Sequence, residues 1–148
     1  MQERFREFTV LMVRINRYIH KIKTEEMAEF DLKSPHVSCL YYLYKAGELT
    51  AKELCDVCAE DKAAVSRSVE YLEKKGLISC ASEAKKRYKA PLTLTEKGKE
   101  IAEKTQRKID DALAVASAGL REENRALMYE CLSLISDNLQ KICDGYEN

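Results

Sequence analysis

The sequence predicts a mainly α-helical protein of the α+β class, and three observations lead to this fold class. Long segments at both ends of the chain carry apolar residues at helical spacing, and shorter capped segments lie between them. After Gly76 the period changes, and residues 77–82 and 92–95 have the composition of two short strands. The chain has 148 residues, 45% of them hydrophobic, which is enough for one ordinary core or for a small domain with a helical accessory region.

The terminal segments predict a helical dimerisation region built from residues 1–32 and 101–148. Within residues 1–30, apolar residues recur at alternating steps of three and four, as at the seam between two helices. These residues are Phe5, Phe8, Met12, Ile15, Ile19 and Ile22. Two further long helices are expected in residues 101–142, with a break at Gly119. Such helices complete either a shared core in a two-fold dimer, which we expect, or a bundle within one chain.

Residues 33–100 predict a compact domain that begins with two capped helices. Ser34 is expected to cap the first helix, with Pro35 at its first helical position, and Gly47 ends it. Thr50 and Glu53 form a capping box that opens a short second helix. A third helix follows after a turn, so the second and third helices predict a helix-turn-helix unit.

The third helix, in residues 61–78, has one apolar face and one presented face. Asp61 is expected to cap its start and Gly76 to supply its left-handed stop. Val65, Val69 and Leu72 share the apolar face. The opposite face carries Ala63, Ser66, Arg67, Glu70 and Lys74, with Lys62 and Ala64 beside them at the N-terminal end.

Small and cationic side chains on the presented face favour nucleic acid as the partner. Ala63, Ala64 and Ser66 allow close approach, while Lys62 and Arg67 are long enough to reach phosphates and base edges. We expect Arg67 to contact a base edge. Glu70 has two interpretations, a hydrogen bond to a cytosine amine or, more ordinarily, an ion pair with Lys74 four residues later.

The segment EAKKRYKAP, residues 83–91, lies between the two predicted strands and predicts a charged wing. The formal charge of the whole chain is zero, yet residues 62–89 hold eight Lys and Arg against three acidic residues, a local charge of +5. This uneven distribution predicts an oriented basic patch suited to DNA. The wing residues expected to contribute are Lys85, Lys86, Arg87, Tyr88 and Lys89.

Other motifs favour ordinary packing over chemistry. Cys55 and Cys58 have the spacing of a zinc or redox motif, but Cys58 shares an apolar face with Leu54 and Val57, which favours a buried small hydrophobe. The chain has no glycine-rich phosphate loop and no nucleophilic triad spacing, so we expect neither an enzyme nor a bound cofactor or metal. It also lacks a long apolar run, which predicts a cytoplasmic protein with no membrane partner, its six cysteines reduced.

In its order of elements and in two motifs, the chain resembles the multiple-antibiotic-resistance regulator (MarR) family of bacterial winged-helix transcription factors. The motifs are VSRSVEYLEKKGLI at residues 65–78 and LTLTEKGKE at residues 92–100. The resemblance implies a winged helix-turn-helix domain and a homodimer on a pseudo-palindromic operator in double-stranded DNA. It places Lys62, Ala63, Ala64, Ser66 and Arg67 at the major groove. Members carry an Asp-x-Arg pair at the wing tip, where this chain has Lys86 and Tyr88.

The resemblance also implies an effector pocket between the dimer helices and the winged domain, for which Ile15, His36, Cys39 and Leu40 are the candidate lining residues. The expected function is a DNA-binding regulator, more often a repressor than an activator, released by a small-molecule, redox or metal signal. Because the Asp-x-Arg pair is missing, the alternative is a winged-helix module that binds protein without DNA.

Overall fold

The computed structural model describes residues 2–81 and 89–147. Two compact units are present, Met1–Ala112 and Leu113–Asn148. The helices of the first unit are α1 (Gln2–Glu26), α2 (Ser34–Ala46), α3 (Ala51–Cys58) and α4 (Lys62–Lys74), with a short 3-10 turn, η1 (Ala28–Phe30), after α1. The long helix α5 (Glu96–Ala116) begins in this unit, and α6 (Glu122–Asp144) belongs to the second. None of the helices in the described residues is both long and apolar enough to span a membrane.

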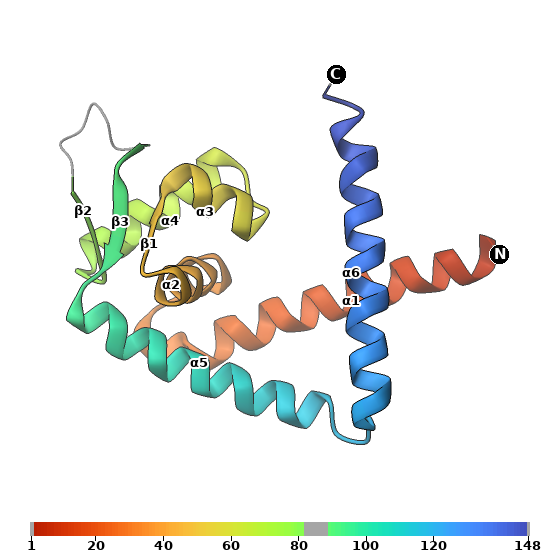
Figure 1. Ribbon diagram of the computed structural model, residues 1–148. Helices are drawn as coiled ribbons and strands as arrows, with labels where there is room; N and C mark the ends of the chain where they lie inside the picture. Colours follow the sequence, from red (N-terminus) through yellow and green to blue (C-terminus); the bar gives the residue numbers. More distant parts are fainter. Residues whose placement is uncertain (1, 82–88, 148) are drawn as a thin grey trace. The chain divides into compact units, whose positions relative to one another are not determined.

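A small antiparallel sheet completes the first unit (Figure 1). Its strands β1 (Glu48–Thr50), β2 (Ile78–Cys80) and β3 (Pro91–Leu94) have the order β1-β3-β2. Leu92 pairs with Leu49 on one side and with Cys80 on the other. Pro91 occupies the first position of β3, as its missing N–H requires. The mainly α-helical winged-helix fold is therefore confirmed, although the sequence predicted two strands and the described residues form three.

The core of the first unit lies where α2, α3 and α4 meet the sheet. Leu40 and Leu43 of α2, Leu54 of α3, Leu72 of α4 and Leu92 of β3 are all fully buried there. Burial of each such side chain stabilises the fold by about 1.5–3 kcal/mol. The core thus fixes α4 against its neighbours and leaves its opposite side to solvent.

Two sequence-based predictions, one for the start of α2 and one for the apolar face of α3, are corrected by the structure. Helix α2 begins at Ser34, with Lys33 at the cap position, because Ser34 is buried and its N–H donates to Thr24 Oγ1 at 3.2 Å. In α3 only Leu54 is buried, whereas Val57 is 42% exposed, so the predicted apolar face is narrower than expected.

The start of α5 is anchored to the turn that follows α4. Thr95 caps α5, since its Oγ1 accepts from Gly98 N at 3.0 Å and donates to Gly76 O at 2.7 Å. Gly76 has φ +69°, the left-handed stop predicted for the preceding helix. Gly98 is buried against Leu77, and a Cβ at this position would collide with the Leu77 carbonyl oxygen. A glycine is therefore required where α5 passes over this turn.

Candidate nucleic-acid interface

Helix α4 presents one side to solvent because the other is buried in the core. Its first turn is capped by Asp61, whose carboxylate accepts from Ala64 N at 2.7 Å. Val65, Ser68 and Leu72 form the buried stripe, at the i, i+3 and i+7 spacing of one helix face. The predicted apolar stripe is confirmed at Val65 and Leu72, and the structure adds Ser68, which the sequence analysis missed despite its position three residues after Val65.

The presented residues lie together at the N-terminal end of α4. Lys62, Ala63, Ser66 and Arg67 are exposed, and Ala64 is half-buried. Helix α3 precedes them and ends at Ala59, a left-handed residue with φ 51°. The result is a surface of small residues with long cationic side chains beside them, which can approach a polyanion closely.

The wing can be followed only at its base. Lys89 is exposed and immediately precedes the segment that leads into β3. Lys85, Lys86, Arg87 and Tyr88, which the sequence assigned to DNA contact, lie outside the described residues. Their role remains a prediction.

Glu70 and Lys74 form the ion pair that the sequence favoured. Lys74 Nζ lies 2.9 Å from Glu70 Oε1, and both side chains are exposed. A pair of this kind contributes only a few tenths of a kcal/mol, about 0.3–0.5, to the stability of a helix. Its main effect here is to hold Glu70 on the helix surface beside Lys74.

A surface cavity of about 490 Å³ lies beside the presented face. Its lining residues come from the segment before α2, from the first turn of α2 and from α4, namely Asp31, Lys33, Pro35, His36, Ala64, Arg67, Ser68 and Tyr71. Of the four residues predicted to line an effector pocket, His36 belongs to this cavity. Cys39 and Leu40 are buried in the core, and Ile15 lies on α1 with 47% of its surface exposed.

The cysteines of α2 and α3 pack against the core. Cys39 is buried, and both a hydrogen bond with Cys58 and burial raise the pKa of its thiol. Cys55 and Cys58 are partly buried against the same hydrophobic cluster. The interpretation of Cys58 as a small hydrophobe fits this packing better than a ligand role does.

His36 joins α2 to α4. Its Nδ1 accepts from the Lys33 N–H at 3.0 Å, and its ring stacks on Tyr71 with centroids 4.2 Å apart. The accepted hydrogen bond places the proton of the neutral ring on Nε2. Burial, and secondarily the positive charge of Lys33, lower the pKa of His36 below its ordinary value of 6.5.

This lowered pKa predicts a loss of stability in mild acid. A folded state that binds the proton less readily than the unfolded chain loses free energy of unfolding as the pH falls below the ordinary His pKa of about 6.5. Between about pH 7.5 and 5, the unfolding free energy of the wild-type chain should therefore fall more than that of His36→Gln, as measured by urea titration. Equal pH slopes in the two proteins would contradict the expectation, and His20, present in both, cancels in the comparison.

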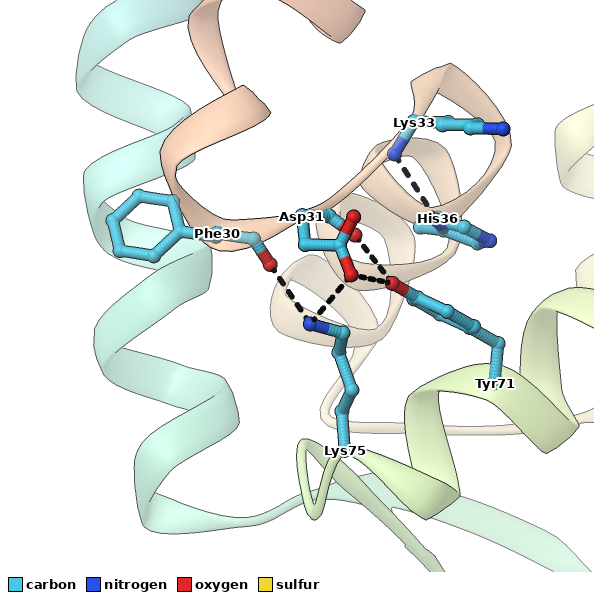
Figure 2. Close-up of polar contacts among 6 residues, drawn as sticks. All are labelled: Phe30, Asp31, Lys33, His36, Tyr71 and Lys75. Atoms are coloured by element: carbon cyan, nitrogen blue, oxygen red, sulfur yellow. Dashed lines mark hydrogen bonds and ion pairs between the residues drawn. The ribbon is translucent and has the colours of Figure 1, made fainter.

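A second group of contacts, which the sequence analysis missed, lies next to His36 (Figure 2). The Tyr71 hydroxyl lies 2.5 Å from Asp31 O and 2.8 Å from Asp31 Oδ2. Lys75 Nζ donates to Phe30 O at 3.2 Å and lies 3.3 Å from Asp31 Oδ2. The hydrogen bond from Tyr71, followed by that from Lys75, lowers the pKa of Asp31, so its carboxylate stays charged. These contacts connect residues 40 and 45 positions apart, which no local pattern indicates.

Sequence comparison finds relatives among bacterial transcriptional regulators. Residues 30–87 match the MarR family profile. The HTH-type transcriptional regulator YdgJ of Bacillus subtilis (strain 168) is 25% identical over 111 residues, which cover 75% of this chain and 68% of YdgJ.

Solved structures share the fold across nearly the whole chain. MarR of Staphylococcus aureus, in complex with salicylate and kanamycin, has a TM-score of 0.80 at 20% identity and covers 92% of both chains. MepR of the same species, in complex with DNA, has a TM-score of 0.77 at 22% identity, covering 89% of this chain and 97% of MepR. Residues 30–87 thus resemble the MarR family of transcriptional regulators, and the winged-helix fold is shared with these solved structures across nearly the whole chain.

Proposed function

We propose that the chain is a homodimeric, sequence-specific DNA-binding repressor that acts in the cytoplasm. The observation that carries this proposal is the exposed N-terminal half of α4, where Ala63 and Ser66 lie between the cationic side chains of Lys62 and Arg67. A core-supported helix with this surface suits the major groove, in which long cations read guanine edges and phosphates. MepR, which shares this fold, is a DNA-bound protein.

Dimerisation is proposed through the terminal helices, residues 1–32 and 101–148, with residues 33–100 as the DNA-reading domain. Helix α1 supports it, because five of its six predicted seam residues are exposed and the sixth, Phe8, is half-buried. Phe5 is 58% exposed, Met12 38%, Ile15 47% and Ile19 37%. A contiguous apolar surface of this kind on a single chain is typical of an interface with a partner.

Release of the DNA by a small molecule is the favoured signal among the three alternatives, which also include oxidants and metals. The cavity beside α4 supports it, because Arg67 belongs to both the cavity and the presented face. A ligand bound there would occupy the side chain expected to read a base. Salicylate, present in the Staphylococcus aureus MarR structure, is a suitable first probe.

The test of the proposal is the effect of Arg67→Ala on sequence discrimination. A duplex is first selected by the wild-type chain from a random library, and dissociation constants are then measured for that duplex and for random DNA. Loss of a bidentate guanine contact is expected to cost about 1–3 kcal/mol on the selected duplex, with a smaller loss on random DNA. Lys97→Ala, which removes an exposed cation of α5 outside both the predicted DNA contacts and the proposed dimerisation region, is the matched control and should leave both constants nearly unchanged.

Failure to select any duplex would favour the alternative, a winged-helix module that binds protein. An Arg67→Ala variant that retained wild-type discrimination would instead leave DNA binding standing and remove Arg67 from the reading surface.

A further inference from the structure

The segment between α1 and α2 is held from two sides by other helices. It consists of η1 and its flanking residues, from Glu26 to Asp31, and we call it the junction. Met27 is almost fully buried, and Asp31 adopts a left-handed conformation with φ 56° and ψ 41°. Asp is among the few residues other than Gly that tolerate this conformation. The chain direction thus changes sharply at Asp31.

Helix α5 holds the junction on one side. Lys108 Nζ donates to Glu26 O at 3.0 Å and lies 2.9 Å from Glu29 Oε1. Thr105 Oγ1 lies 3.4 Å from the sulfur of Met27. Because α1 ends in the junction, these contacts fix the end of α1 against α5.

Helix α4 holds the junction on the other side, through its C-terminal half. Figure 2 shows the Tyr71 hydroxyl and the Lys75 ammonium converging on Asp31, with Phe30 O as a further acceptor for Lys75. Tyr71 and Lys75 are four residues apart and therefore lie on the same face of the helix. The presented residues Ser66 and Arg67 belong to the same rigid helix, so any rotation of α4 about the junction moves them.

We propose that Tyr71 and Lys75 are positioning residues, which set the angle between α4 and α1 by binding Asp31 and so determine the half-site spacing that the dimer accepts. This inference rests on the proposed function, in which α1 joins the two protomers and α4 reads DNA. Since one base pair spans about 3.4 Å, a small rotation at the junction is enough to change the register of one recognition helix against the other.

The expected effect on DNA binding is larger than the effect on folding stability, which distinguishes a positioning role from a structural one. The ion pair between Lys75 and the exposed carboxylate of Asp31 adds little to folding, and the core leucines hold α4 against α2, α3 and the sheet rather than against α1. Couplings carried by such networks reach about 0.5–2 kcal/mol, which is about a 2- to 30-fold change in a binding ratio. Replacement of Tyr71 or Lys75 should therefore change the selectivity for half-site spacing and leave the thermal stability nearly unchanged.

The experiment uses the full chain and Tyr71→Phe, which deletes the hydroxyl and keeps the ring on His36. The wild-type chain first selects a duplex with two half-sites from a random library, and versions with one base pair inserted or removed between the half-sites are then made. In Tyr71→Phe, the ratio of dissociation constants between altered and selected spacing is expected to shrink by about 2- to 30-fold. Lys75→Met, which removes only the ammonium group, should change the ratio in the same direction.

Tyr44→Phe is the matched control, because it removes a hydroxyl whose hydrogen bond goes to Glu103 of α5, at 3.4 Å. It should leave the spacing ratio unchanged and set the reference for the unfolding midpoint. A Tyr71→Phe ratio equal to that of the wild type would overturn the inference while DNA binding stood. Equal weakening at every spacing, together with a lowered unfolding midpoint, would assign Tyr71 a structural role only. A wild-type chain that selects no duplex would overturn the proposed function itself.

Discussion

Binding to duplex DNA is expected to weaken by about 10³- to 10⁵-fold when salt is raised from 50 to 200 mM, for six to ten phosphate contacts per dimer. Each Lys or Arg that neutralises a phosphate releases condensed counterions, and added salt opposes that release. The net charge of the chain is zero, so the effect depends on the local excess of positive charge in residues 62–89. Lys62 and Arg67 on α4 and Lys89 at the base of the wing are exposed in that stretch.

Fluorescence anisotropy of a labelled random duplex, measured at several salt concentrations, provides the test. Replacement of Lys86 by Ala in both protomers should reduce the slope of log K against log salt by about two, one for each contact. The matched control is Lys97→Ala, because Lys97 is an exposed lysine of α5 and lies outside residues 62–89. A binding constant independent of salt would rule out phosphate contacts and favour a protein partner.

Gly98→Ala is expected to destabilise the fold, although the same change stabilises most helices. Alanine is favoured over glycine in a helix interior by about 0.8–1.0 kcal/mol. Here the added Cβ would collide with the backbone carbonyl oxygen of Leu77, which cannot rotate away as a side chain can. Overpacking costs about 1–3 kcal/mol, and a clash with backbone belongs at the upper end of that range. The steric cost should therefore exceed the gain in helix propensity.

Urea unfolding of the Gly98→Ala chain measures this difference directly. Lys97→Ala, one residue earlier on the exposed side of α5, should change the unfolding free energy by no more than about 0.5 kcal/mol. If Gly98→Ala instead raised stability by the usual helix increment, then α5 would not press on the turn after α4 as the structure describes.

The sequence predicted the elements whose signals are local. Asp61, the Thr50–Glu53 capping box and Gly76 define helix ends through their neighbours, and all three act as expected. Strand β1 was missed because Leu49 is its single apolar residue, which gives neither an apolar run nor an alternating pattern. Strand β1 forms because it pairs with β3, which lies far along the sequence.

In the candidate site, too, the features with local sequence signals were predictable and those that depend on long-range contacts were not. Periodicity alone places Ser66 and Arg67 outward and Val65 and Leu72 inward. The contacts of Asp31 were not predictable, because they depend on how the chain turns before α2. A tyrosine at position 71, between buried and exposed stripes, was the available signal, since a half-buried hydroxyl usually finds a partner.

The strand order has a consequence for the behaviour of the molecule at high concentration. The middle strand β3 has both edges paired, and the two outer strands are three residues long. Short outer strands offer few free backbone groups to a strand from another molecule, which protects against aggregation by edge-to-edge pairing. Pairing through the sheet edges is thereby disfavoured when many copies of the chain are crowded together.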